Sequence, residues 1–190
     1  MNFLNSYELP ILDFIRDNLG CAFLDKVMPI ITSLADKGIF WIAVAVIMLF
    51  FRKTRKMGIT MGVALVLGLA LGNGVLKNLF NRARPFAEIE DIQLLIEKPH
   101  DPSFPSGHTL ASFEAAGAMM FYNKKFGIPA LVLASLIAFS RMYLYVHYPT
   151  DILGGIVFGL LFAFVGYVIV KYVYKKFGFD KDTEIEKIKD

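Results

Sequence analysis

Five long apolar stretches constrain this 190-residue chain more than any other feature. They cover residues 38–51, 57–80, 107–122, 126–146 and 152–170. A membrane span needs about 20 apolar residues, and the two shorter stretches can extend into their flanks. A weaker sixth segment covers residues 21–35, and residues 9–19 have the pattern of an amphipathic surface helix. The sequence therefore predicts an all-α polytopic membrane helix bundle, with about six transmembrane helices after an N-terminal amphipathic helix.

Composition supports a membrane protein and argues against several other classes. Hydrophobic residues make up 56% and charged residues 19% of the chain, against about 45–50% and about 25% in soluble domains. The net charge of +3 is too small to indicate nucleic-acid binding, and the single Cys21 permits no internal disulfide. We expect one membrane domain over residues 1–176, a charged cytoplasmic tail over 177–190, and no obligate protein partner.

Basic residues in the loops predict the orientation of the bundle, because cytoplasmic loops carry an excess of lysine and arginine. With the spans above, three basic clusters fall on one side, and the long loop 81–106 and the turn 147–150 fall on the other. We therefore expect a multi-pass protein of the plasma membrane, with the long loop outside the cytoplasm. The clusters are Arg52, Lys53, Arg55 and Lys56; Lys124 and Lys125; and Lys171, Lys175 and Lys176.

The first motif whose residues could take part in binding or catalysis is Lys77 followed by Arg84 and Pro85. Asn73, Lys77 and Asn81 have i, i+4, i+8 spacing, so we expect them on one helix face. Two cations near the membrane edge with no acid close by in sequence would attract an anion. Snorkelling towards lipid headgroups is the alternative reading of Lys77.

The second motif is Pro105-Ser106-Gly107-His108, at the start of the apolar stretch 107–122. Ser106 is a candidate N-cap, and Gly107 would let another group approach the backbone closely. Free N–H groups at a helix N-terminus form an anion site. A phosphate bound there would place His108 within reach of its ester oxygen.

The third motif is Ser140-Arg141, followed by His147 and Asp151. The guanidinium of Arg141 matches phosphate oxygens in geometry. A hydrogen bond from His147 to Asp151 would fix the tautomer of the imidazole and make its other nitrogen more nucleophilic. Helix capping is the alternative reading of Asp151.

Together the spacings resemble the three signature motifs of the type 2 phosphatidic acid phosphatase family. The superfamily of that family also includes bacterial acid phosphatases and vanadium haloperoxidases. Every signature position is filled in this chain. The matching stretches are Lys77-x6-Arg84-Pro85, Pro105-Ser106-Gly107-His108 and Ser140-Arg141-x5-His147-x3-Asp151.

The resemblance implies a role for each matching residue. His147 would be the nucleophile that forms a phosphohistidine, Asp151 would orient it, and His108 would be the general acid. The remaining positions would hold the phosphoryl oxygens; they are Lys77, Arg84, Ser106, Gly107 and Arg141. The sequence has no carboxylate cluster suited to magnesium, and we expect neither a metal nor another cofactor.

The expected function is hydrolysis of a lipid phosphate or diphosphate, with the site facing outside the cytoplasm. Undecaprenyl diphosphate is the favoured substrate, and phosphatidylglycerol phosphate or phosphatidic acid is a close alternative. Further alternatives are a lipid phosphotransferase, a vanadate-dependent halide oxidase and a membrane protein that binds lipid phosphate without cleaving it. Glu114, inside an apolar stretch, is expected either to bond within the bundle or to touch substrate.

Overall fold

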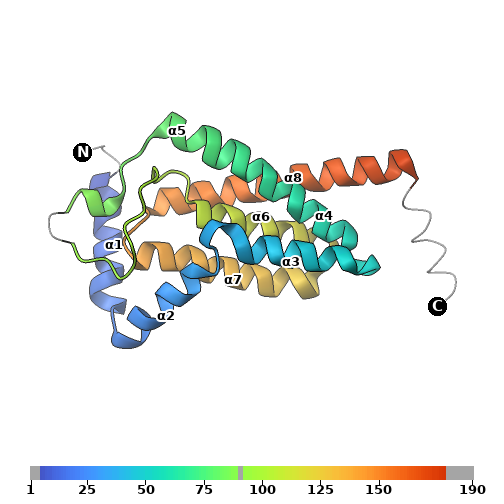
Figure 1. The fold of residues 1–190 in the computed structure, drawn as a ribbon. Coiled ribbons are helices and arrows are strands. Elements are labelled where there is room, and N and C mark those ends of the chain that lie inside the picture. Colours follow the sequence, from blue (N-terminus) through green and yellow to red (C-terminus); the bar gives the residue numbers. More distant parts are fainter. Residues whose placement is uncertain (1–4, 90–91, 179–190) are drawn as a thin grey trace.

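A computed structural model describes residues 5–89 and 92–178, and this part of the chain contains helices and no strands. Long helices run side by side as a bundle, and α1 lies across one of its ends (Figure 1). The predicted all-α architecture is thus confirmed. In chain order the elements are α1 (Asn5–Leu19), α2 (Ala22–Ser33), η1 (Asp36–Gly38), α3 (Ile39–Phe50), α4 (Arg52–Leu67), η2 (Gly68–Leu76), α5 (Lys77–Phe80), η3 (Pro85–Ala87), α6 (Gly107–Tyr122), α7 (Lys124–Tyr143) and α8 (Pro149–Phe177).

Helix α6 forms the centre of the bundle and packs against α4, α7 and α8. Its small residues Ala115, Ala116 and Ala118 are buried, which lets the neighbouring helices approach closely. A Cβ atom built on Gly159 of α8 would lie 2.8 Å from the carbonyl oxygen of Leu110. Gly159 therefore lets α8 pack closely against α6.

The outer faces of the helices carry large apolar side chains that are exposed, including Phe50, Val66, Val157 and Phe164. Within the described residues, three helices are long and apolar enough to cross a membrane, namely Arg52–Ala87, Lys124–Tyr143 and Pro149–Phe177. The pair Ala22–Ser33 and Asp36–Phe50, bent by 41°, would add a fourth if it forms one broken span. Helix α6 has 16 residues and is covered by protein along much of its length.

The helix predicted over residues 57–80 has an irregular centre. It continues from α4 into η2, a π-helical segment rich in glycine, and then into α5. A Cβ atom on Gly68 would lie within 2 Å of the Glu114 carboxylate, and one on Gly72 would lie 2.3 Å from Leu110. The π-helix therefore brings the backbone against α6. Asn81 adopts a left-handed conformation after α5 ends, so the prediction that it shares a helix face with Lys77 is wrong.

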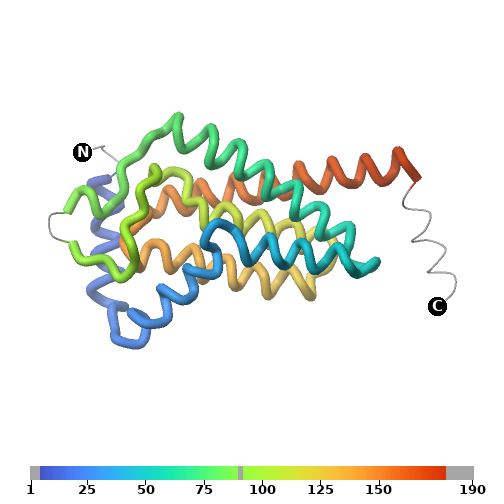
Figure 2. Tube along the Cα trace, in the orientation of Figure 1, coloured from blue at the N-terminus to red at the C-terminus, as the bar shows by residue number. Residues whose placement is uncertain are grey.

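The two ends of the bundle differ in character. The chain turns between α3 and α4 and between α6 and α7 at one end, and α8 also finishes there (Figure 1). Helix α1 and the long loop after α5 cover the opposite end (Figure 2). The three basic clusters thus lie together, away from the long loop. Residues 179–190, most of the predicted charged tail, lie outside the described residues.

Candidate active site

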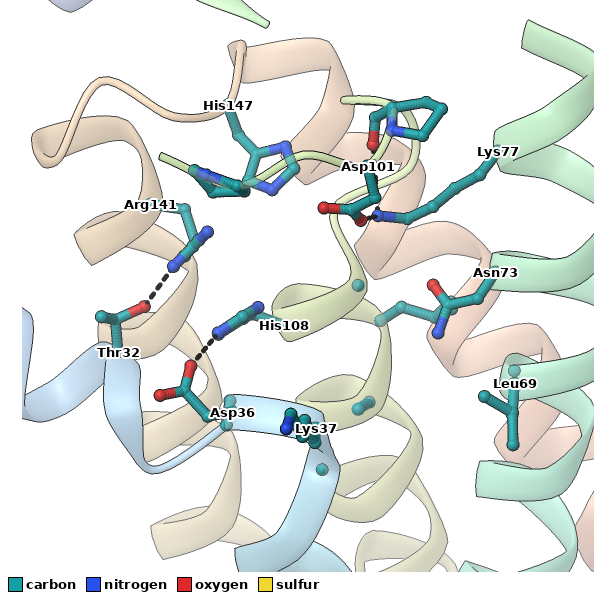
Figure 3. A pocket seen from close by; sticks show the side chains of 18 of the residues that line it. Thr32, Asp36, Lys37, Leu69, Asn73, Lys77, Asp101, His108, Arg141 and His147 are labelled. Carbon is teal, nitrogen blue, oxygen red and sulfur yellow. Dashed lines mark hydrogen bonds and ion pairs between the residues drawn. The ribbon is translucent and has the colours of Figure 1, made fainter. Parts of the chain in front are cut away.

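The three motifs meet at the end of the bundle that is covered by α1 and the long loop. Lys77 comes from α5, Arg84 from the loop that follows, His108 from the first turn of α6 and Arg141 from the last turn of α7. These side chains and that of His147 line one cavity of about 1410 Å³ (Figure 3). Gly107 also lines this cavity, whereas Ser106 and Asp151 lie behind its wall, fully buried.

His147 and Asp151 are close together, as the sequence predicted. Nδ1 of His147 lies 3.4 Å from Oδ2 of Asp151, longer than a good direct hydrogen bond. Ser103 connects the two groups: its hydroxyl donates to Asp151 Oδ2 at 2.5 Å and lies 3.3 Å from His147 Nδ1. The imidazole is therefore oriented by a carboxylate and a serine together.

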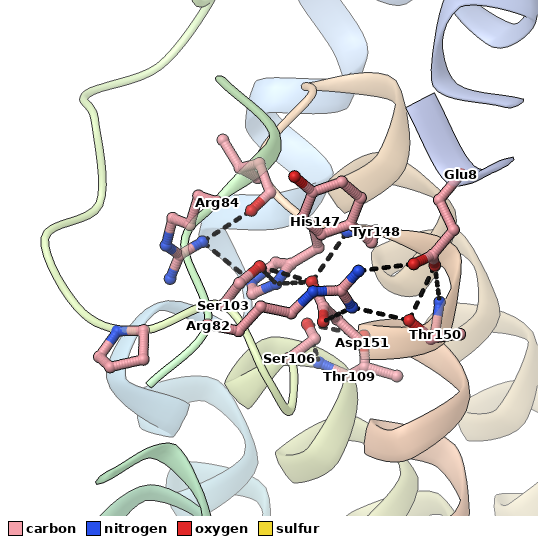
Figure 4. A network of polar contacts seen from close by, with 12 residues as sticks. Glu8, Arg82, Arg84, Ser103, Ser106, Thr109, His147, Tyr148, Thr150 and Asp151 are labelled. Carbon is pink, nitrogen blue, oxygen red and sulfur yellow. Dashed lines mark hydrogen bonds and ion pairs between the residues drawn. The ribbon is translucent and has the colours of Figure 1, made fainter. Parts of the chain in front are cut away.

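A buried network holds the Asp151 carboxylate from its other sides (Figure 4). Oδ2 accepts the Tyr148 N–H at 2.8 Å, and Oδ1 accepts Arg82 Nη1 at 2.8 Å. Arg82 also donates to Glu8 at 2.5 Å and to Thr150 at 2.7 Å. Glu8 of helix α1 thereby holds Arg82 in place, and Arg82 in turn holds the Asp151 carboxylate.

The second nitrogen of His147 faces the cations. Nη1 of Arg84 lies 3.1 Å from Nε2 of His147. A guanidinium N–H can only donate, so Nε2 accepts and the proton of a neutral ring lies on Nδ1, beside Asp151. Burial, followed by the positive charges of Arg84, Arg141 and Lys77, lowers the pKa of His147 well below its ordinary value. The neutral ring therefore presents its lone pair to the cationic side of the cavity.

Lys77 and Arg84 have an acidic partner, contrary to the expectation drawn from the sequence. Both pair with the carboxylate of Asp101 in the long loop, and Arg84 Nη2 donates to it at 2.8 Å. Burial by itself would raise the pKa of Asp101, but the hydrogen bond from Lys77 and the charges of Lys77 and Arg84 hold it well below its ordinary value. A carboxylate therefore occupies the cations that a phosphoryl group would need.

Arg141 retains a free donor for an anion. Its Nη1 donates to Thr32 of α2 at 2.8 Å. Its buried Nε has no acceptor among the described residues. A buried donor without a partner is costly, and a phosphoryl oxygen would satisfy it.

The start of α6 has the predicted N-cap. The Ser106 hydroxyl accepts from the Thr109 N–H at 3.4 Å and from the Thr109 hydroxyl at 3.0 Å. A Cβ atom on Gly107 would lie 3.2 Å from Asn73 Oδ1 and 3.9 Å from Lys77 Nζ. A side chain at this position would thus crowd Asn73, beside the N-terminus of α6, where free N–H groups favour an anion.

Glu114 is also part of the cavity wall. The side chain is buried, and its Oε1 has no hydrogen-bond partner among the described residues. It abuts Gly68 of η2, on the side of the cavity lined by Ile42, Leu65 and Leu69. The cavity therefore extends from the cationic end towards an apolar region between α3, η2 and α6.

Sequence reasoning missed the residues that hold the motif side chains in place. Arg82 has the clearest signal, since a third basic residue stands between Lys77 and Arg84. Ser103 is close in sequence to the second motif, but its contact with Asp151 is made over 48 residues. The missed partners include Glu8, Thr32, Asp36, Arg82, Asp101 and Ser103.

The sequence was compared with models of known protein families. The family model described as the PAP2 superfamily matches residues 56–175, which is more than half of the chain and includes all three motifs. The chain belongs to the PAP2 superfamily. The match begins after α3, so Glu8, Thr32 and Asp36 of this PAP2 protein lie outside the matched region.

Relatives of this PAP2 protein include membrane lipid phosphatases. It is 36% identical to the undecaprenyl-diphosphatase of Sulfolobus acidocaldarius over 66% of this chain and 61% of that protein, less than two thirds of its length. It is 32% identical to undecaprenyl-diphosphatase BcrC of Bacillus subtilis over 75% of this chain and 72% of that protein. The crystal structure of a transmembrane PAP2-type phosphatidylglycerolphosphate phosphatase from Bacillus subtilis matches with a TM-score of 0.71 and 31% identity, covering 93% and 88% of the chains.

Proposed function

We propose that this PAP2 protein is an integral membrane phosphatase that hydrolyses a lipid phosphate or diphosphate through a phosphohistidine on His147. One observation carries the proposal. The lone pair of His147 Nε2 faces a buried arginine, while its Nδ1 lies beside a carboxylate. That arrangement suits attack on a phosphorus atom whose oxygens are held by cations.

In the first step, His147 Nε2 attacks phosphorus, and the bond from phosphorus to the leaving oxygen breaks. Lys77, Arg84, Arg141 and the N-terminus of α6 stabilise the charge on the phosphoryl oxygens. His108 donates a proton to the leaving oxygen. The positive charge that develops on the His147 ring is stabilised by the carboxylate beside Nδ1.

In the second step, water attacks the phosphohistidine and the bond between nitrogen and phosphorus breaks. His108, which is neutral after the first step, takes the proton from that water. Inorganic phosphate leaves, and both histidines return to their initial states. Residues of the chain carry out every proton transfer and stabilise every charge in this scheme, so we propose that the reaction needs no metal.

The shape of the cavity supports a lipid substrate. Its cationic end would hold the phosphate, and its apolar region beside Leu65 and Leu69 would receive the start of a hydrocarbon chain. Among lipids we propose an isoprenoid diphosphate such as undecaprenyl diphosphate, because the names of two relatives state this activity. Phosphatidylglycerol phosphate is the second candidate, supported by the structural match along most of the chain.

We also propose that the protein crosses the plasma membrane several times, with the site outside the cytoplasm. The support is the gathering of the basic clusters at the end of the bundle away from the cavity. A substrate delivered from the outer leaflet would then reach the cationic end without crossing the bilayer.

The test is release of inorganic phosphate in detergent from undecaprenyl diphosphate, phosphatidylglycerol phosphate and phosphatidic acid, with a chelator present throughout. We expect turnover by the purified protein and none by His147→Ala, whose insertion and thermal unfolding serve as the folding control. Release by the folded variant at the wild-type rate would contradict the nucleophile. Loss of wild-type activity on chelation, restored by added metal, would contradict metal independence.

A further inference from the structure

His108 has a carboxylate partner from the part of the chain that precedes the matched family region. Oδ1 of Asp36 lies 2.8 Å from Nε2 of His108. Asp36 is the first residue of η1, the short turn at the bend between α2 and α3. The bend thus brings an acid to the mouth of the cavity, beside the proposed general acid.

The contact determines which nitrogen of His108 can act on a substrate. Asp36 occupies Nε2, so Nδ1 is the nitrogen left for a leaving oxygen. His108 and His147 both line the cavity, and Asp36 lies on the side of His108 that is away from His147 (Figure 3).

Because cations surround His108, acid catalysis by its ring needs the carboxylate of Asp36 as a partner. Burial, and after it the positive charges of Arg141 and Lys77, disfavour a second proton on the His108 ring. Asp36 is the carboxylate that acts in the opposite direction. Its side chain is 61% exposed, so water screens the pair in the open cavity. A lipid that fills the cavity would expel this water and strengthen the pair.

We propose that Asp36 is a positioning residue that favours the protonated form of His108 and directs its Nδ1–H at the leaving oxygen. The proposal rests on the proposed phosphatase function and adds a residue to it. Asp36 does not touch the phosphoryl group and acts only through His108. The site is therefore completed by the bend between α2 and α3, outside the three motifs.

The decisive experiment varies the leaving group, because only a poor leaving group needs a proton. Phosphatidic acid expels an alkoxide, whereas p-nitrophenyl phosphate expels a stable phenolate without help. General acid catalysis contributes about 10²–10⁴-fold, so we expect Asp36→Asn to lose about 30-fold or more in kcat/KM, which reports the first step, on phosphatidic acid. On p-nitrophenyl phosphate the loss should stay within about threefold, since acid assistance is small there.

Two further variants separate positioning from folding. Asp36→Glu keeps the carboxylate and should recover much of the activity on phosphatidic acid. Asp17→Asn removes an exposed acid on α1 and should match the wild type on both substrates. Equal losses on both substrates in Asp36→Asn, or no loss on either, would overturn the proposal.

A second measurement does not depend on turnover. The chain has three histidines, so ring ¹⁵N signals can be assigned in detergent by single substitutions. In Asp36→Asn, the protonation midpoint of His108 should move to lower pH, because the favourable carboxylate is lost while Arg141 and Lys77 remain. An unchanged midpoint would overturn the proposal even if no phosphate release is found. Absence of release from every lipid, with the midpoint shifted, would instead count against the proposed function alone.

Discussion

Nη1 of Arg84 lies 3.1 Å from Nε2 of His147, so the proposed nucleophile and a phosphate-binding cation are in direct contact. The same arginine donates to the backbone oxygen of Val146 at 2.9 Å and to the Asp101 carboxylate at 2.8 Å. Its position is therefore fixed from three sides. A phosphoryl oxygen bound to Arg84 would place phosphorus next to the lone pair of Nε2.

The first prediction concerns pH. Burial and the cations Arg84, Arg141 and Lys77 lower the pKa of His147 below its ordinary value of 6.5. Because the lowered pKa favours the neutral, nucleophilic ring, kcat/KM should persist as pH falls through 6.5 and decline only at lower pH. Arg84→Gln removes one of those charges and should move the acid limb upward, although its activity is much reduced. Titration of the substrate is common to both proteins, so an unmoved limb in the variant would contradict this cause.

The second prediction concerns the carboxylate that competes for the cations. Asp101→Asn should strengthen inhibition by orthovanadate about fivefold, since a half-exposed ion pair contributes roughly 1 kcal/mol or less. The matched control is Glu97→Gln, which removes an exposed acid that also lines the cavity but pairs with neither Lys77 nor Arg84. Weaker inhibition of Asp101→Asn would mean that the carboxylate holds Lys77 and Arg84 in place more than it competes for them.

The third prediction concerns packing between α6 and α8. A methyl group on Gly159 would lie 2.8 Å from the Leu110 carbonyl oxygen and 2.9 Å from Phe113 Cβ. Overpacking of this kind costs about 1–3 kcal/mol, so Gly159→Ala should lower the unfolding temperature in detergent by about 3–8 °C. Gly62→Ala is the matched control, because a Cβ atom at Gly62 meets nothing within 4 Å. Equal unfolding temperatures for the two variants would contradict the close approach of the helices.

The fourth prediction concerns orientation. In a Cys21→Ala background, a cysteine at Leu95 in the long loop should react with a membrane-impermeant maleimide on intact cells. A cysteine at Lys53, in the basic turn at the start of α4, should react only after permeabilisation. The replacement of Cys21 is needed because that thiol is exposed. The reverse pattern would place the cavity on the cytoplasmic side.

The gathering of the motif residues at one end of the bundle could be predicted because their signals are local and their spans are regular. Hydrophobic length and basic loops were enough to bring Lys77, His108 and His147 to the same end of the bundle. Ser106 as N-cap followed from the residue type and the helix start. These inferences needed no knowledge of how the helices pack.

The partners of those residues could not be predicted, because their contacts join distant parts of the chain. Glu8 and Asp36 reach Arg82 and His108 across 74 and 72 residues, and no spacing rule links such positions. Asp101 is one acid among several in the long loop, so the composition of the loop gave no reason to choose Asp101 as the partner of Lys77 and Arg84. Asn81 was misplaced because α5 ends at Phe80 and Asn81 itself adopts a left-handed conformation, a break that an i, i+4 pattern does not reveal.

The apolar region of the cavity, beside Leu65 and Leu69, has a kinetic consequence. If a lipid enters with its tail still among other lipids, encounters take place in two dimensions. The rate then follows the mole fraction of substrate in the membrane or micelle, and diluting the suspension with buffer leaves it unchanged. Adding inert lipid at constant substrate would slow the reaction, as surface dilution kinetics require.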